Sequence, residues 1–192
     1  MAGKISVLVA VILFLCMAVV AGAAQNVAPK VGSPLPEMEL VKPNDSADLK
    51  YLGLSFFGKT FQVDRVEAKV VIIQIFSMYC PYCQADAPNV NRLYGLIENN
   101  PALKNKIKII GIGVGNTPFE VETFKKKYKV PFPLISDEGF KVHKIVGEVR
   151  TPYFIAVKIA PNGRTEVIYS RLGALENNDQ FLAQLVKSAS IK

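Results

Sequence analysis

Two cysteines separated by two residues are the part of this sequence best suited to chemistry. The motif Cys80-Pro81-Tyr82-Cys83 follows a β-branched apolar run at residues 70–76 that is typical of a buried strand, and apolar residues then recur at helical spacing. Cys80 is therefore expected at a helix N-terminus, where unpaired N–H groups and the helix dipole favour a thiolate. Cys83 would lie one turn further on and can attack a mixed disulfide formed at Cys80. The spacing predicts a nucleophilic thiol with a resolving partner.

Other uses of the two cysteines fit the sequence less well. A structural disulfide would close a loop of only a few residues and add little stability, because the entropy gained grows with loop length. A zinc site uses four ligands, whereas residues 24–192 contain two cysteines and one histidine, His143. Covalent haem attachment needs His directly after the second Cys, where this chain has Gln84. We interpret His143, on a predicted helix, as a surface or packing residue.

Alternating strands and helices are predicted to position the two thiols. Strands are predicted at residues 38–41, 70–76, 107–114, 133–136, 153–159 and 164–170, a hairpin at 52–63 around Gly58-Lys59, and helices at 81–98, 117–128, 138–146 and 177–188. Strands joined by helices run parallel, whereas the tight turn at residues 160–163 makes the last two strands antiparallel. The sequence therefore predicts a single α/β domain with a mixed central sheet flanked by helices.

The first segment has the layout of an export signal. Lys4 is followed by the uncharged and largely apolar residues 5–24, which end in Ala21-Gly22-Ala23-Ala24. We interpret residues 1–23 as a signal peptide and residues 24–192 as one domain. The uncharged stretch approaches the roughly 20 residues that span a bilayer, so an uncleaved membrane anchor is the alternative. In either form the domain is exported, and it is periplasmic or anchored on the outer face of the cytoplasmic membrane.

The composition is that of an ordinary globular protein with a basic surface. The chain has 192 residues, is 50% hydrophobic and carries a formal net charge of +7. Its basic residues are spread along the sequence and the domain is expected to be exported, so we expect no nucleic acid partner. The densest cluster, Lys125-Lys126-Lys127-Tyr128-Lys129, is typical of a solvated helix end. Attraction of this cluster to anionic lipid or to an acidic partner is the alternative.

From about residue 31 to residue 187 the sequence resembles the thioredoxin-like fold, specifically the exported thiol–disulfide oxidoreductases of the TlpA/ResA type. Besides the cysteine motif, the resemblance rests on Val31-Gly32-Ser33-Pro34-Leu35-Pro36, Gly58-Lys59-Thr60, Thr151-Pro152, Pro161-Asn162-Gly163-Arg164 and Gly173. It implies an N-terminal β-hairpin extension in front of a thioredoxin-like sheet. It also implies a cis peptide bond before Pro152, which would hold the Thr151 backbone beside Cys80 to pair with a substrate peptide.

The resemblance further implies roles for residues around the cysteines. Thioredoxins have a buried acid where this chain has Gln74, whereas TlpA/ResA-type proteins have a carboxylate three residues after the second cysteine, where this chain has Asp86. Asp86 is therefore expected to relay the proton of Cys83 and to raise the pKa of that thiol. A solvent-facing aspartate that merely suits the helix dipole is the alternative. The substrate-facing residues are expected to be Tyr79, Pro81, Tyr82, Thr151 and Pro152.

Three functions are compatible with these residues. The first is an exported reductant that exchanges a dithiol with disulfides of protein substrates, for example in cytochrome c maturation. It needs no cofactor beyond the Cys80–Cys83 disulfide, but it needs a membrane electron-transfer partner. The second is a thiol peroxidase, because peroxiredoxins share this fold; Ser77 would replace their threonine, while Ile73 stands in place of their proline. The third is a non-enzymatic assembly factor that carries copper or zinc on the cysteine pair.

Overall fold

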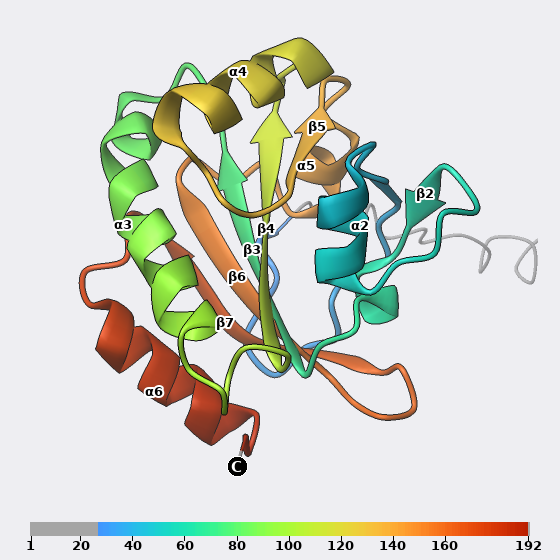
Figure 1. Cartoon of the computed structure of the whole chain (residues 1–192), viewed down its shortest axis with the longest axis vertical. Coiled ribbons are helices and arrows are strands. Elements are labelled where there is room, and N and C mark those ends of the chain that lie inside the picture. Colours follow the sequence, from blue (N-terminus) through green and yellow to red (C-terminus); the bar gives the residue numbers. More distant parts are fainter. Residues whose placement is uncertain (1–26, 192) are drawn as a thin grey trace, which may run out of the picture.

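Five strands form a mixed sheet at the centre of the protein, seen in a computed structural model that describes residues 27–191 (Figure 1). The strands are β3 (Val70–Phe76), β4 (Ile107–Val114), β5 (Leu134–Asp137), β6 (Tyr153–Ile159) and β7 (Thr165–Leu172). Their order is β5-β4-β3-β6-β7. β4 is parallel to β3 and to β5, whereas β6 is antiparallel to β3 and to β7. The predicted mixed sheet is confirmed.

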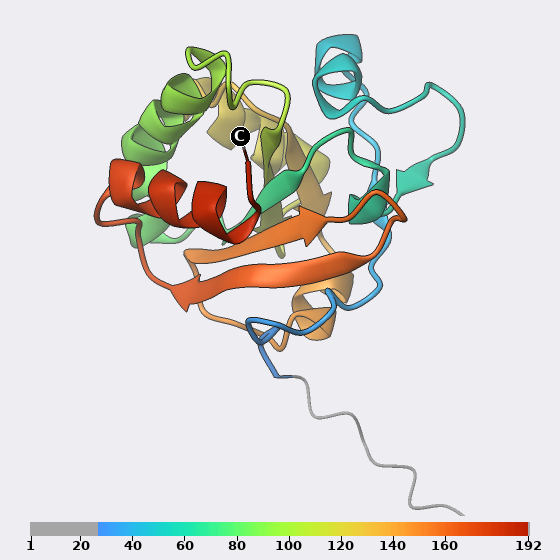
Figure 2. The same cartoon turned by 90° about the horizontal axis from the view of Figure 1, so that it is seen from below.

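Both faces of the sheet are covered, as Figure 2 shows. Helices α3 (Pro81–Glu98), α4 (Pro118–Tyr128) and α6 (Asn178–Ser188) pack on one face, and α5 (Lys141–Ile145) and the N-terminal lead-in pack on the other. Alternate residues of β3 supply the two cores: Val70, Ile72 and Phe76 face the first, and Val71, Ile73 and Ile75 face the second. Every residue of β3 is buried, so its apolar run is confirmed as a central strand.

An antiparallel strand pair precedes the sheet, but its residues differ from those predicted. β1 (Leu40–Val41) pairs with β2 (Thr60–Phe61), with Leu40 opposite Phe61. The predicted hairpin over residues 52–63 is wrong, because only Thr60–Phe61 of this range forms a strand and its partner β1 precedes helix α2 (Ser46–Leu52). Asp45 caps α2 by accepting the Ala47 N–H at 2.7 Å, and Gly53 ends α2 with a φ of 69°. The short turn η1 (Val63–Arg65) follows β2.

Helix α2 closes the side of β4 that β5 leaves uncovered. β5 pairs with β4 only from Gly111 onward, and the N–H of Ile109 is instead accepted by the Tyr51 hydroxyl at 2.9 Å. The Lys108 ammonium lies 4.3 Å from the Tyr51 ring centroid and 3.7 Å from Glu98 Oε1. An ion pair of 2.6 Å between Asp48 and Lys125 ties α2 to α4. We call these five residues, Asp48, Tyr51, Glu98, Lys108 and Lys125, the α2 seam.

The predicted starts of the two helices nearest the cysteines are confirmed. Cys80 is the N-cap of α3, and Thr117 and Glu120 form a capping box at the start of α4. α5 is shorter than predicted, because Phe140 has a φ of 56° and residues 138–140 form a turn. No helix among residues 27–191 combines the length and the apolar character needed to cross a bilayer. The predicted signal peptide or anchor lies outside the described residues.

Candidate active site

Cys80 sits where the central strand passes into the longest helix. Residues 77–79 link β3 to α3, and the backbone of Cys80 is extended, with φ −80° and ψ 114°. Pro81 occupies the first helical position, where its missing N–H costs nothing because that group would be unpaired in any case. Cys80 therefore presents its sulfur at the positive end of the α3 dipole.

Two polar side chains fix the loop in front of Cys80. The buried Asn116, which follows β4, accepts the N–H of Met78 at 2.8 Å. Gln84 of α3 donates to the Met78 carbonyl at 2.7 Å. The carboxyl ends of the parallel strands β3 and β4 meet at this edge of the sheet, so Asn116 reaches the loop from a neighbouring strand. This clamp sets the position of Cys80 independently of the substrate.

The two thiols are free and unequal. The Cys83 N–H donates to Cys80 Sγ at 3.4 Å, and the Cys80 thiol contacts the Thr151 carbonyl at 3.4 Å. Burial by itself would raise the pKa of Cys80, but hydrogen bonding with the Thr151 side chain and with Cys83 outweighs burial, so the pKa lies below its ordinary value. Cys83 is 0% exposed, and burial raises its pKa to about 12. The difference in burial and pKa is what the predicted roles require, an attacking thiol at Cys80 and a resolving thiol at Cys83, and those roles remain predictions.

The loop before β6 presents Thr151 to the cysteines. The Thr151–Pro152 peptide bond is cis, which confirms the predicted isomer. Two contacts support this loop: the Gly173 N–H donates to the Pro152 carbonyl at 2.9 Å, and the His143 imidazole contacts the Val149 carbonyl at 2.9 Å. The half-buried His143 is therefore a packing residue, as predicted, and it packs under the cis-proline loop.

A cavity of about 520 Å³ opens beside the thiols. Three segments form its walls: the first turns of α3, the cis-proline loop and the end of β7 with the residues after it. Residues that line it include Tyr82, Asp86, Arg150, Thr151, Pro152 and Leu172. The walls are largely apolar, with a carboxylate and a guanidinium as charged groups, which is the composition of a site that binds a side chain or short peptide.

Asp86 is only 6% exposed, so the alternative of a solvent-facing aspartate is wrong. Its Oδ1 accepts from Asn89 at 3.0 Å, while its Oδ2 is buried without a hydrogen-bond partner among the described residues. Burial raises the pKa of Asp86, and the Asn89 contact opposes that shift. Asp86 can therefore hold a proton more readily than an exposed aspartate, one helical turn from Cys83. Its predicted role in proton relay remains a prediction.

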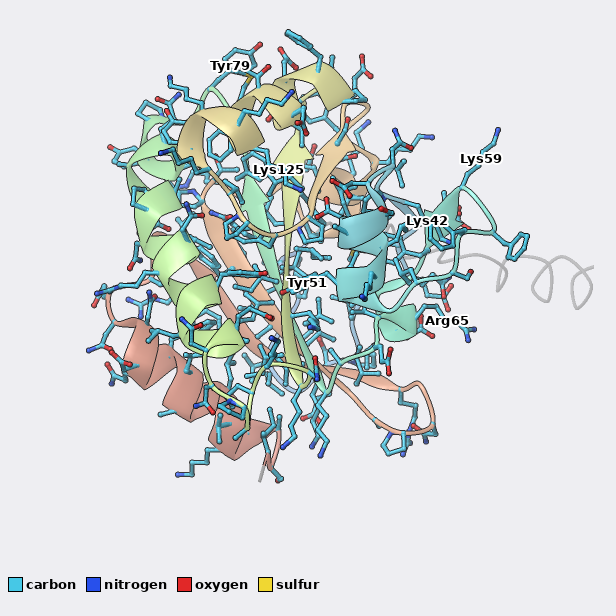
Figure 3. The ribbon with its side chains drawn as sticks, in the orientation of Figure 1. Lys42, Tyr51, Lys59, Arg65, Tyr79 and Lys125 are labelled. Atoms are coloured by element: carbon cyan, nitrogen blue, oxygen red, sulfur yellow. The ribbon has the colours of Figure 1, made fainter. Side chains whose placement is uncertain are left out.

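Tyr79, which precedes the cysteine motif, and Tyr82, which lies within it, point in different directions. Tyr82 is exposed and lines the cavity, whereas the hydroxyl of the exposed Tyr79 donates to Glu120 of α4 (Figure 3). Pro81 is exposed at the start of α3. The structure thus brings Tyr82, Thr151 and Pro152 together at the cavity, while Tyr79 leans away toward α4. The contact of these residues with a substrate remains a prediction.

Three residues that the structure places at the site are absent from the set predicted from the sequence. Leu172 and Arg150 line the cavity, and Asn116 clamps the loop before Cys80. Asn116 carried a usable signal, because polar residues that follow adjacent parallel strands converge at one sheet edge. Leu172 carried none, because β7 was expected to end two residues earlier.

The two alternative functions, a thiol peroxidase and a metal-carrying assembly factor, depend on Ser77 and on a group of metal ligands. The Ser77 hydroxyl accepts the Tyr79 N–H at 3.4 Å, and the Ser77 carbonyl accepts the Cys80 N–H at 3.1 Å. Within residues 27–191 no three His, Cys, Asp or Glu side chains gather in a way that could hold a metal ion. The chemistry that this edge of the sheet visibly supports is dithiol–disulfide exchange.

A dithiol at a helix N-terminus, beside a cis-proline loop on a mixed sheet, defines a protein of the thioredoxin-like class. The model of the AhpC/TSA family matches residues 31–169, and the chain belongs to this family. Thiol-disulfide oxidoreductase ResA of Oceanobacillus iheyensis is 24% identical over 179 residues, which cover 90% of this chain and 84% of that relative. The protein of the same name from Geobacillus thermodenitrificans is 24% identical over 163 residues, covering 84% and 81%.

Solved structures agree with this assignment of the fold. StoA from Bacillus subtilis has a TM-score of 0.52 at 17% identity, covering 67% of this chain and 90% of that one. The thioredoxin domain of a thiol-disulfide oxidoreductase from Bacteroides vulgatus has a TM-score of 0.58 at 14% identity, covering 84% and 99%. The predicted thioredoxin-like fold and the resemblance to ResA-type proteins are confirmed.

Proposed function

We propose that this protein reduces disulfide bonds of exported proteins by thiol–disulfide exchange at Cys80 and Cys83. The coarser assignment, a thiol–disulfide oxidoreductase, agrees with the ResA relatives and with the thioredoxin-like fold. The observation that carries the proposal is the inequality of the thiols. Cys80 is partly exposed with a lowered pKa, whereas Cys83 is buried with a pKa of about 12.

The reaction proceeds in two balanced displacements. The Cys80 thiolate attacks one sulfur of the substrate disulfide, forms a mixed disulfide and releases the other sulfur as a thiolate that takes up a proton. Cys83 then loses its proton and attacks Cys80 Sγ, which releases the second substrate sulfur as a thiol. The substrate gains two electrons and two protons, and Cys80 and Cys83 become a disulfide. Asp86 is proposed to accept the Cys83 proton, because its raised pKa brings the two groups closer in proton affinity.

The groups around Cys80 favour a reductant over a strong oxidant. A strong oxidant stabilises its thiolate deeply, because a stable reduced form draws electrons to the pair. The groups that lower the pKa of Cys80 are neutral: Thr151, Cys83 and the backbone of Tyr82. Neutral donors give weaker stabilisation than a neighbouring cation. A thiolate stabilised by neutral donors and by the α3 dipole favours a reducing potential over that of a strong oxidant.

The cavity beside the thiols is proposed to receive the substrate polypeptide. Thr151 contributes backbone groups for pairing with an extended segment, and the apolar walls formed by Tyr82, Pro152 and Leu172 would take a side chain next to the substrate cysteine. The docked segment would bring its disulfide to Cys80, whose sulfur touches the Thr151 carbonyl. Cytochrome c maturation is a proposed setting, in which the substrate is an apocytochrome with its cysteines oxidised.

We further propose that the domain works outside the cytoplasm. The apolar residues 5–24 support export, either as a cleaved signal or as an anchor. In an oxidising compartment a spent disulfide must be reduced again, so a membrane dithiol donor is the partner that this function requires. No bound cofactor is needed, because the cysteine pair itself carries the two electrons.

The reduction potential of the Cys80–Cys83 pair tests the proposal. The purified protein is equilibrated in graded glutathione or dithiothreitol buffers, and alkylated thiols are counted by mass. We expect a potential at or below roughly −250 mV, the range of reductants, whereas a value near −120 mV would be that of an oxidant of the DsbA kind and would overturn the direction. A pair that exchanged with neither buffer would overturn the exchange function itself, and rapid consumption of hydrogen peroxide would favour a thiol peroxidase.

A further inference from the structure

The loop between α2 and β2 exposes two adjacent aromatic side chains. Phe56 is 76% exposed and Phe57 is 88% exposed, the largest fraction for any large apolar side chain that the structure describes. They belong to residues 55–59, Ser-Phe-Phe-Gly-Lys, which we call the Phe loop. Two neighbouring phenylalanines held in water indicate a binding surface more strongly than single apolar side chains scattered elsewhere.

The Phe loop is held in shape by Lys42, which directly follows β1. The Lys42 ammonium donates to the Ser55 carbonyl at 2.8 Å and also to the Phe57 carbonyl, and the Lys42 N–H donates to the Lys59 carbonyl at 2.9 Å. Three alternate carbonyls of the loop are therefore already paired. Because an unpaired carbonyl is costly to remove from water, a loop with paired carbonyls can enter an apolar medium at lower cost.

Cations accompany the two aromatic rings. Lys59 is exposed directly after Gly58, and Figure 3 shows Lys59 projecting outward on the same side of the molecule as Lys42. The Lys125–Lys129 cluster, whose attraction to anionic lipid was the alternative from sequence, is partly neutralised. Lys125 pairs with Asp48 at 2.6 Å, and Lys126 pairs with Glu122 at 3.3 Å. The Phe loop combines apolar and cationic groups, which is the composition of segments that lie in the headgroup region of a bilayer.

The Phe loop lies away from the thiols. In Figure 3, Tyr79, which precedes Cys80, lies near α4, whereas Lys59 lies on the opposite side beside β2. The view of Figure 2 likewise separates α3 from β2. A surface bound through the Phe loop would therefore leave the cavity beside Cys80 open to a substrate. In the uncleaved form, the apolar residues 5–24 of the same chain would keep the domain next to a membrane.

We propose that the Phe loop docks this domain on an anionic lipid bilayer. Phe56 and Phe57 enter the interfacial region, and Lys59 binds the phosphate of the headgroups. Lys42 acts as a positioning residue, because its ammonium holds the loop carbonyls. The edge of the sheet that carries Cys80, Cys83 and Asp86, which we call the thiol edge, would face away from the bilayer and stay accessible to exported proteins.

A tryptophan reporter tests the proposal, since the chain contains no Trp. The full chain carrying Phe57→Trp is reconstituted into vesicles of equal parts phosphatidylcholine and phosphatidylglycerol, with bromine on the lipid chains. The matched control is Phe119→Trp, at a residue 79% exposed on α4. We expect the emission of Phe57→Trp to shift to shorter wavelength and to be quenched by bromine, while that of Phe119→Trp stays unshifted and unquenched.

The charge of the loop provides a second arm. One cation near an anionic surface contributes an attraction equivalent to about a fivefold change in an equilibrium constant. Lys59→Gln in the Phe57→Trp background should therefore lower the ratio of docked to undocked loop about fivefold, and Lys187→Gln on α6 should leave it unchanged. Vesicles of phosphatidylcholine alone should lower this ratio at least as much as Lys59→Gln does, because they remove the negative surface charge altogether.

Two outcomes would overturn the proposal. Equal emission and quenching of the Phe57→Trp and Phe119→Trp proteins would show that the loop does not enter the bilayer, and a protein partner would then be its occupant. Strong quenching of Phe57→Trp that ignored both the phosphatidylglycerol and Lys59 would exclude the role of anionic headgroups.

Discussion

The thiol edge and the α2 seam both contain polar groups removed from water, but they satisfy these groups differently. In the α2 seam the Tyr51 hydroxyl completes the hydrogen bonding of β4, and Asp48 and Lys125 form an ion pair of 2.6 Å. At the thiol edge Asp86 keeps one buried oxygen unpartnered among the described residues, and the pKa values of the two cysteines are shifted in opposite directions. Glu98 Oε1 of the seam also accepts no hydrogen bond, but the Lys108 ammonium lies 3.7 Å from it, whereas Asp86 has no ion pair among the described residues. The buried charges of the α2 seam are therefore compensated by opposite charges, whereas the carboxylate of the reactive site retains capacity for a proton.

The largest expected effect at the thiol edge comes from the two cysteines. Cys80→Ser should abolish exchange with any disulfide, because a hydroxyl is not ionised near neutral pH and cannot replace the attacking thiolate. Cys83→Ser should still attack but should accumulate a mixed disulfide on Cys80, because the resolving thiol is missing. Mass spectrometry of the protein after incubation with a disulfide substrate distinguishes the two variants. A mixed disulfide on Cys83 of the Cys80→Ser protein would reverse the assigned roles.

The pH dependence of alkylation sharpens the contrast between the thiols. The pKa of Cys80 is lowered, so its alkylation rate should reach half its maximum below the ordinary thiol value of 9.0. Cys83 should remain unreactive until the pH approaches its pKa of about 12. Iodoacetamide labelling followed by peptide mapping measures both profiles. Coincident profiles for the two residues would contradict the inequality on which the proposed function rests.

Asp86→Asn tests whether the spare carboxylate oxygen moves a proton. If Asp86 accepts the Cys83 proton, the variant should slow resolution of the mixed disulfide about 100-fold, the lower end for general base catalysis. The burst of mixed-disulfide formation at Cys80 should be unaffected. Glu176→Gln, at an exposed carboxylate, is the matched control. Equal loss in both the attack and the resolution steps would indicate a structural role for Asp86.

Asp86→Asn should also change the free energy of unfolding, by an amount that depends on pH. The folded-state pKa of Asp86 is raised, so its contribution to stability is fully present below its ordinary value of 3.8 and is lost as the pH rises through the raised value. Asp86→Asn should therefore equal the wild type in acid and exceed it at neutral pH. Urea unfolding at several pH values measures this difference. A variant less stable at neutral pH would show that the ionised carboxylate has a partner.

Tyr51→Phe probes the opposite side of the comparison. The variant leaves the buried N–H of Ile109 without its acceptor and should cost about 1–3 kcal/mol of unfolding free energy. The rate of disulfide exchange should not change, because the α2 seam does not contact the thiols. Tyr94→Phe, in the neighbouring ring 5.8 Å from Tyr51, is the matched control and should cost less. A fall in exchange rate at constant stability would contradict the separation of the two regions.

The same two regions show what the sequence can predict. Around Cys80 every local signal agrees: a β-branched run, a proline at the first helical position and helical spacing afterwards, so the bounds of β3 and α3 match the prediction. In residues 46–63 the signals conflict. Asp45 and Gly53 are typical of the two ends of a helix, whereas the alternation of apolar and polar residues after Leu52 favours a strand. Helix α2 is stabilised because Tyr51 hydrogen-bonds to β4 and Asp48 forms an ion pair with α4.

Contacts between distant segments account for what the sequence could not predict at the site. Leu172 and Arg150 reach the cavity only because β7 and the cis-proline loop end beside α3. The hydroxyl of Tyr79 donates to Glu120, 41 residues later, a contact for which the sequence around Cys80 gives no signal. Such pairings depend on the packing of α4 against β4, which no local pattern encodes.

The smallest expected effect comes from Tyr79→Phe, which breaks the contact with Glu120. Tyr79 is exposed and Glu120 is half-buried, and Asn116 and Gln84 hold the adjacent loop without them. We therefore expect kcat/KM for a protein disulfide to fall at most about fivefold, and exchange with a small disulfide to stay unchanged.

The same contact should also depend on pH, because the hydrogen bond from Tyr79 lowers the pKa of Glu120. The stabilisation that Tyr79→Phe removes should be present above the ordinary glutamate value of 4.5 and should be lost as the pH falls through the lowered pKa. Glu120→Gln weakens the same hydrogen bond and also the capping box with Thr117, so the double variant should lose no more than Glu120→Gln alone. Additive losses would mean that Tyr79 also contacts the substrate directly, as the sequence predicts.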